Sequence, residues 1–124
     1  MKLRSLFSVA ALCLFAASYL PAQDAAKTDP AHYKVVFENE NVRVLHVHYG
    51  PHEKSVMHSH PAAVIVYLSD GDMHFTLPGG KTMPAAAHKD ETQYSPATTH
   101  QPENMGDTPF DAVLVELKHP ARKK

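Results

Sequence analysis

Three histidines have the spacing of residues that could bind one metal ion together. His58 and His60 stand two positions apart at the start of an apolar, strand-like run, and residues at i and i+2 of a strand project from the same face. His100 follows a second strand-like segment, just before a Gly-Asp turn. Three converging imidazoles suit a divalent transition metal, so the spacing predicts that His58, His60 and His100 bind Fe, Mn, Ni, Cu or Zn.

The elements that would position these histidines are short strands. Apolar residues alternate with polar ones in segments such as 42–49 and 110–118, and residues 62–68 form a continuous apolar run bounded by Ser-Asp-Gly. Such segments, separated by Gly, Pro and Asn turns, are typical of strands. Roughly eight of them follow one another between residues 33 and 118 without a convincing helix. This pattern predicts an all-β sandwich or barrel.

The segment from Gly50 to Gly71 resembles the first sequence motif of the cupins. That motif consists of a glycine, a His-x-His pair, a glutamate three or four residues further on, and a second glycine. Gly50, His58, His60 and Gly71 match it, with two extra residues after Gly50. The glutamate position falls on Val64, with six residues between it and Gly71. This chain therefore resembles a cupin whose motif carboxylate is replaced by valine.

A later segment resembles the second cupin motif. Pro96, His100 and Asn104 match it, with Thr98 near the position of a glycine. The resemblance implies a cupin-type jelly-roll β-barrel over residues 33–119, with a metal held at the open mouth by the three histidines. Some cupin thiol dioxygenases are similar in using three histidines without a carboxylate. Asn104 and Pro96 are interpreted as turn-forming residues.

Other polar side chains are candidates for the same pocket. In residues 42–49, His46 and His48 share a face with Val42 and Val44, and that face looks either into the barrel or out to solvent. His46 and His48 are therefore secondary candidates, together with His74 and Gln93. The residues that could replace the missing carboxylate ligand are His74, Gln93, Glu91 and Glu116. The histidines expected at the surface are His32, His52, His88 and His119.

The two ends of the chain have compositions of their own. Residues 1–22 combine basic Lys2 and Arg4 with an apolar stretch and end in Ala22, which predicts a signal peptide and a periplasmic or secreted protein. An uncleaved membrane anchor is the alternative. Residues 23–32 lack periodicity and are interpreted as a flexible linker, and residues 120–124 as a basic, solvated tail.

Charge restricts the partners that the exported chain could bind. Lys2 and Arg4 are 2 of the 12 basic residues, so 10 remain against 13 acidic ones and the net charge is −3 with histidine neutral. This balance disfavours nucleic acid and, after cleavage of the leader, anionic membranes as partners. The expected partner is a small-molecule ligand or substrate. A homodimer, with residues 33–38 at the contact, is a further expectation, because similar cupins are commonly dimers.

Two classes of function remain open from the sequence. The first is an exported, metal-dependent, oxygenase-like enzyme acting on a small acidic or hydroxylated molecule, in which the metal is a Lewis acid or oxygen activator. The second is a non-catalytic module that binds a small ligand or a metal in the same pocket. No Ser, Cys or Lys stands out as a nucleophile beside a base, which disfavours covalent catalysis, and no catalytic residue is assigned.

Overall fold

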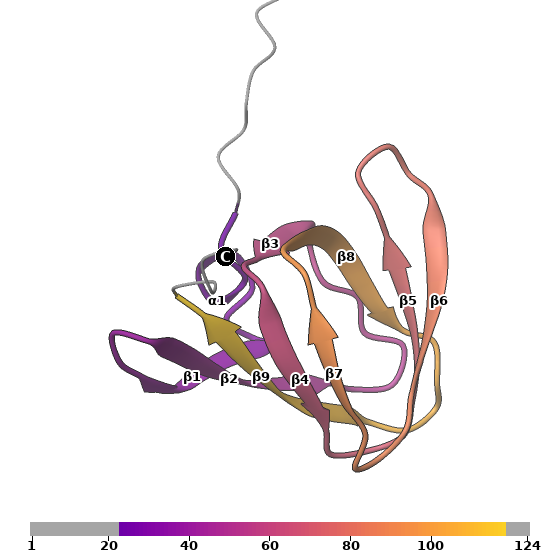
Figure 1. Ribbon diagram of the computed structural model, residues 1–124. Coiled ribbons are helices and arrows are strands. Elements are labelled where there is room, and N and C mark those ends of the chain that lie inside the picture. The colour runs from indigo at the N-terminus through magenta and orange to yellow at the C-terminus, as the bar shows by residue number, and fades with distance from the viewer. Residues whose placement is uncertain (1–22, 119–124) are drawn as a thin grey trace, which may run out of the picture.

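Strands are the main secondary structure of the described part of the chain. The structure is a computed structural model that describes residues 23–118 (Figure 1). Within this range one short helix, α1, precedes nine strands. The bounds are α1 Ala25–Thr28, β1 Tyr33–Glu38, β2 Val42–Tyr49, β3 His58–His60, β4 Ala63–Tyr67, β5 Gly71–Thr76, β6 Thr82–Ala87, β7 Thr92–Ser95, β8 Thr98–Asn104 and β9 Phe110–Leu117.

The strands form two antiparallel sheets that enclose one core. One sheet has the order β1-β2-β9-β4-β7 and the other the order β3-β8-β5-β6. Leu45 and Leu114 from the first sheet and Met73 from the second belong to the same buried cluster. The all-β jelly roll predicted from the strand pattern is thereby confirmed, with nine strands between residues 23 and 118 in place of roughly eight.

Strict alternation along β2 and β9 decides which side chains face the interior. Leu45, Val47 and Tyr49 of β2 are buried, and Ala112 and Leu114 are their counterparts on β9. Burying a side chain of this size contributes about 1.5–3 kcal/mol, so a one-residue slip, which would expose all of them, is strongly disfavoured. The intervening residues of both strands are thereby fixed on the outer face.

The register between β3 and β8 brings the three histidines together. His58 lies opposite His100, and His60 lies opposite Thr98, in an antiparallel pair. Directly opposed residues have Cβ atoms about 4.5–5.5 Å apart, so this register alone places His100 beside the His58 side chain. Pro61 follows the histidine pair and is not part of a strand, so it separates β3 from β4.

Residues 23–32 belong to the folded domain, and the prediction of a flexible linker is wrong for them. Asp24 caps α1 by accepting a hydrogen bond from the Lys27 amide at 3.2 Å, and Ala25 is fully buried. The Ser59 amide donates to the carbonyl of Gln23 at 2.7 Å. A helix of four residues is stable only through tertiary contacts, here with the strand that carries His58 and His60. The sequence of residues 23–32 has no periodicity of its own, so it did not predict this packing.

The predicted signal peptide, residues 1–22, and the predicted basic tail, residues 120–124, lie outside the described residues, as does His119. Within residues 23–118, no helix is long and apolar enough to cross a membrane.

Candidate metal centre

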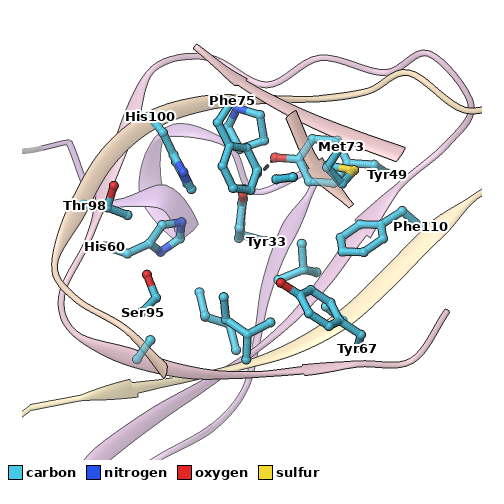
Figure 2. Close-up of a pocket in the computed structure, with 17 residues that line it drawn as sticks. Tyr33, Tyr49, His60, Tyr67, Met73, Phe75, Ser95, Thr98, His100 and Phe110 are labelled. Atoms are coloured by element: carbon cyan, nitrogen blue, oxygen red, sulfur yellow. Dashed lines mark hydrogen bonds between the residues drawn. The ribbon is translucent and has the colours of Figure 1, made fainter. Parts of the chain in front are cut away.

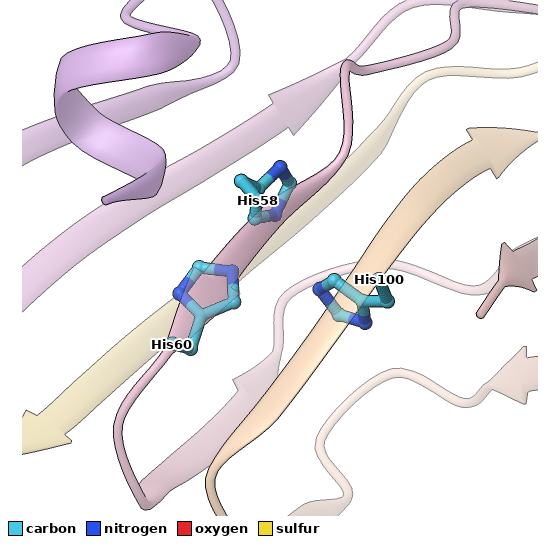
Figure 3. A group of neighbouring side chains, drawn as sticks. All are labelled: His58, His60 and His100. Carbon is cyan, nitrogen blue, oxygen red and sulfur yellow. The ribbon is translucent and has the colours of Figure 1, made fainter. Parts of the chain in front are cut away.

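His58, His60 and His100 converge on one point inside the barrel. Each offers a ring nitrogen, and these three atoms lie within 4.8 Å of one another (Figure 3). The ring centroids are 4.8 Å apart for His58 and His60, 5.1 Å for His58 and His100, and 5.3 Å for His60 and His100. All three ring pairs are close to perpendicular, at 82° to 88°. The rings are therefore not stacked face to face, and each can direct a nitrogen toward a shared centre.

Hydrogen bonds on the far side of two rings fix which nitrogen is free. Nδ1 of His58 lies 2.8 Å from the carbonyl oxygen of Val56, which can only accept, so Nδ1 carries the proton. Nδ1 of His60 likewise lies 2.9 Å from Oε1 of Glu116. In a neutral imidazole the other nitrogen, Nε2, then holds the lone pair. Both rings are therefore set in the tautomer that binds a metal through Nε2.

Two of these nitrogens are buried without a partner. Among residues 23–118, Nε2 of His58 and Nε2 of His100 have no hydrogen-bond partner. A buried polar atom left unsatisfied costs about 1–3 kcal/mol, so a structure that keeps two of them side by side is destabilised unless something binds there. A divalent transition metal fits this donor set, since imidazole nitrogen is one of its preferred ligands.

Burial keeps two of the rings uncharged. Desolvation, followed by the proximity of His60, lowers the pKa of His58 from 6.5 to about 4. Desolvation, followed by His60 and His58, lowers the pKa of His100 from 6.5 to about 3. At neutral pH both rings therefore have a lone pair to donate and no proton to lose first.

A buried ion-pair network orients His60 from behind. Glu116 is 2% exposed, and its Oε2 accepts hydrogen bonds from Nε of Arg43 at 2.7 Å and is 2.6 Å from Nη2. Nη2 of Arg43 also donates to Oδ2 of Asp24 at 2.6 Å. Glu116 was predicted as a possible replacement metal ligand. Instead it lies on the Nδ1 side of His60, and it is not part of the histidine cluster.

A second polar network supports His58. The Ser55 hydroxyl lies 3.2 Å from Nδ1 of His58 and donates to the buried carboxylate of Asp29. Nδ1 of His32 lies 2.7 Å from the same carboxylate, and its ring stacks on Tyr49 with centroids 4.3 Å apart. His32 was predicted at the surface, but only 14% of its side chain is exposed. His52 and His88 are exposed, as predicted.

A cavity opens beside the histidines. Its volume is about 70 Å³, measured as the space open to the centres of water molecules. His60 and His100 line it together with Ser95 and Thr98, and Tyr33 lies next to the histidines (Figure 2). The remaining wall is apolar or aromatic. The side chains of this wall are Val47, Tyr49, Ala63, Ile65, Tyr67, Met73, Phe75, Ala85, Pro102, Phe110, Ala112 and Leu114.

The secondary candidates do not line this cavity, so their prediction as pocket residues is wrong. His46 and His48 occupy the outer face of β2, where Asp111 contacts them at 3.1 Å and 2.8 Å. The reason is the parity of the strand, since Leu45, Val47 and Tyr49 fill the interior. His74 lies 3.8 Å from Asp72, with 39% of its side chain exposed.

Gln93 and Glu91 are also outside the cavity. Gln93 is exposed and accepts a hydrogen bond from the Tyr67 hydroxyl at 3.1 Å. Glu91 is exposed as well, on the loop before β7. Within residues 23–118, none of the residues predicted as a replacement carboxylate or amide ligand belongs to the metal-binding group of the three histidines or lines the cavity.

The position of the missing carboxylate also needs correction. Val64 does not line the cavity, whereas its neighbours on β4, Ala63 and Ile65, do. Because successive side chains of a strand point to opposite faces, a carboxylate at Val64 would point away from the three histidines. A spacing of four residues after His60 falls on Ile65, which is the residue that faces the cavity. The interior is apolar at this position as well.

Other motif positions have structural roles. Asn104 is 1% exposed, and its amide donates to the carbonyls of Gly50 at 3.0 Å and Thr108 at 2.9 Å, as expected of a turn-forming residue. A Cβ atom at Gly71 would lie 2.5 Å from Cδ2 of Phe110. The glycine is therefore required by the close approach of the Phe110 ring.

Solved structures with the same fold provide an independent comparison. A cupin domain from Bordetella pertussis Tohama I aligns with a TM-score of 0.66 and 25% identity, covering 70% of this chain and 92% of that one. An uncharacterised double-stranded β-helix protein from Klebsiella pneumoniae aligns with a TM-score of 0.55 and 23% identity over 70% and 76% of the two chains. An RmlC-like cupin from Methanocaldococcus jannaschii aligns with a TM-score of 0.56 and 18% identity, covering 71% of this chain and 80% of that one. No family model and no curated protein matches the sequence.

The sheet arrangement and these neighbours show that the chain has the fold of a small cupin domain. The resemblance found in its two histidine motifs is confirmed at the level of the fold.

Proposed function

We propose that this cupin binds one divalent transition metal through Nε2 of His58, His60 and His100. The observation that carries the proposal is the pair of buried, unpartnered Nε2 atoms on His58 and His100, which lie beside a third ring within ligand distance of one ion. The ion is Fe, Mn, Ni, Cu or Zn. Three protein ligands leave open positions for a small molecule, as in catalytic metal sites generally.

The favoured function is that of an oxygenase-like, metal-dependent enzyme acting on a small molecule. A bound metal would supply Lewis-acid or oxygen-activating chemistry at the open positions. The chain's own contribution is to hold two rings neutral by burial, to fix His60 through Glu116, and to keep a mostly apolar cavity next to the centre.

One observation favours a second candidate, a non-catalytic module that binds a ligand or a metal in the same cavity. Within residues 23–118, no carboxylate, lysine or cysteine lines the cavity, so histidine and tyrosine are the only lining residue types suited to general acid or base catalysis. Burial raises the pKa of the three lining tyrosines above the ordinary value. Turnover of a candidate substrate by the metal-loaded protein under oxygen supports the enzyme. Binding of the substrate without turnover supports the module.

The metal is tested by elemental mass spectrometry on untagged protein beside the double variant His58→Ala/His60→Ala. The wild type is expected to contain about one metal per chain, and the variant to contain almost none. Little metal in the wild type, even after incubation with excess Zn²⁺, Fe²⁺ or Cu²⁺, contradicts the proposal. Circular dichroism of the variant separates loss of the site from loss of the fold.

We also propose export and a homodimer. Export is supported by the composition of residues 1–22, and the mass of protein recovered from a periplasmic or culture fraction tests it, since retention of residues 1–22 contradicts cleavage. The dimer is supported by the edge strand β1, whose Val36 and Phe37 are 56% and 54% exposed. Light scattering at tens of micromolar tests it, and a monomer mass contradicts it.

A further inference from the structure

We propose that the cavity accepts a small, mostly apolar molecule of about one ring, which offers a single oxygen or sulfur donor to the metal and carries no charge at its other end. The inference rests on the metal site proposed above and narrows its substrate class. The sequence led to the broader expectation that the substrate is any small acidic or hydroxylated molecule, and this proposal replaces that expectation.

Apart from the tyrosine hydroxyls, the polar side chains of the cavity lie at one end. His60, His100, Thr98 and Ser95 lie together on one side in Figure 2, while Met73 and Phe110 lie on the opposite side. Ser95 already donates its hydroxyl hydrogen to the carbonyl of Pro96 at 3.1 Å. A bound molecule is therefore expected to direct its donor atom toward the histidines and its body toward the apolar end.

The tyrosine hydroxyls do not make the apolar end charged. The hydroxyls of Tyr33 and Tyr49 are 2.8 Å apart and hydrogen-bond to each other, and the Tyr67 hydroxyl donates to Gln93. Burial raises the pKa of Tyr33 and Tyr49 above the ordinary value, so both remain neutral phenols at pH 7. No side chain at this end offers a charge to a ligand.

Within residues 23–118, no lysine or arginine lines the cavity. A second ionised group on the ligand would therefore lose its water without gaining a partner of opposite charge, which is costly. Amino-acid thiols, dicarboxylates and phosphorylated sugars all carry such a group. The lining thus excludes them and retains phenols, short alkyl thiols and similar molecules with one ionisable donor.

Charge balance at the metal favours that single donor. Three neutral imidazoles leave the 2+ charge of the ion without a protein anion beside it. The buried carboxylate next to the site, Glu116, is engaged by Arg43 and by Nδ1 of His60. A phenolate or thiolate on the ligand supplies the missing negative charge.

The size and the aromatic wall limit the body of the ligand. A cavity of about 70 Å³ on this measure holds roughly five to seven water-sized spheres, which corresponds to a single ring or a short chain. Phe75 and Phe110 are on the wall with Met73. Aromatic rings and thioethers make favourable contacts with a bound ring.

The test compares p-cresol with 4-hydroxybenzenesulfonate, which has the same phenol but carries at its far end a sulfonate, a charged group that is a poor metal ligand. Both are titrated into the zinc-loaded protein by calorimetry at pH 7. We expect p-cresol to bind at least tenfold more tightly. Equal or tighter binding of 4-hydroxybenzenesulfonate overturns the proposal, and so does the absence of binding by p-cresol to protein that retains its zinc.

A matched pair of variants locates the binding. Ala85 lines the cavity, whereas its neighbour on β6, Ala86, is exposed. Ala85→Phe is expected to weaken p-cresol binding at least tenfold at unchanged zinc content, and Ala86→Phe to leave it unchanged. Equal effects of the two substitutions on p-cresol binding would contradict binding of p-cresol in this cavity.

A separate experiment distinguishes failure of the metal proposal from failure of the cavity proposal. If the wild-type protein does not bind zinc, the metal proposal is wrong, and the metal-free protein is titrated with toluene and with benzoate. Tighter binding of toluene then supports the apolar cavity on its own. Equal or tighter binding of benzoate overturns the cavity assignment too.

Discussion

Substitution of Glu116 by Gln tests whether the residues behind the histidines help to build the metal centre. The carboxylate accepts from Nδ1 of His60 at 2.9 Å and from Nε of Arg43 at 2.7 Å, and it is 2% exposed. Glutamine keeps the volume but has one acceptor oxygen in place of two, and its amide group would face a hydrogen-bond donor. Either His60 or Arg43 therefore loses its acceptor.

The expected magnitude follows from these contacts. Loss of a hydrogen bond that orients a metal-binding histidine lowers metal affinity about 10- to 100-fold, which is about 1.4–2.7 kcal/mol of binding free energy. Breaking a buried ion pair costs about 3–5 kcal/mol of stability. Arg43 keeps its contact with Asp24 at 2.6 Å, so we expect a loss at or below the lower end of that range.

The assay is competition for Zn²⁺ against a chromogenic chelator, with urea unfolding measured in parallel on the metal-free proteins. Asp111→Asn is the matched control, because Asp111 is also on β9 and also contacts a histidine, His48, at 2.8 Å, but on the outer face. The control is expected to keep wild-type zinc affinity. A Glu116→Gln protein that is folded and binds zinc within twofold of wild type refutes the reasoning, as does an equal loss in Asp111→Asn.

The remaining predictions concern the triad, pH and a motif glycine. His100→Ala is expected to lower metal content strongly and His88→Ala, at an exposed position, to leave it unchanged; equal content in the two would show that the triad is misassigned. In metal-free protein, the pKa values of about 4 for His58 and about 3 for His100 lie below the ordinary value of 6.5. At pH values between the folded and the ordinary pKa, the unfolded chain therefore binds more protons than the folded protein. The free energy of unfolding should therefore fall by a few kcal/mol as the pH drops from about 7 to 4, as expected from the difference in proton binding between the two states. Unfolding free energies that stay constant over this range would contradict the neutral burial of both rings. Gly71→Ala should cost about 1–3 kcal/mol of stability through overlap with Phe110, and an unchanged urea midpoint would contradict that overlap.

Residue patterns were sufficient for the fold and for the three histidines. Alternation in 42–49 and 110–118 predicted strands that the structure contains, and the His-x-His pair predicted two rings on one face. These predictions succeed because the period of a strand is a local property of the backbone. Composition failed for residues 23–32, where burial of Ala25 and the cap at Asp24 hold the segment on the barrel.

The role of Glu116 had a signal in the sequence that was not used. Glu116 continues the alternation of Phe110, Ala112 and Leu114, all of which are buried. A charged residue in phase with an apolar face is expected to have a buried partner. The identity of that partner, Arg43, depends on the pairing of β2 with β9, which links residues distant in the chain.

What the sequence by itself determined is the class of the fold, the strand pattern and the identity of the converging histidines, because each follows from spacing along one strand or from a motif. Tertiary structure alone decided which face of each strand looks inward. It placed His46, His48 and Val64 outside the cavity and Ile65 inside it. The physical reason is that parity within a strand defines two faces but does not say which is buried; the packing of the two sheets against each other makes that choice.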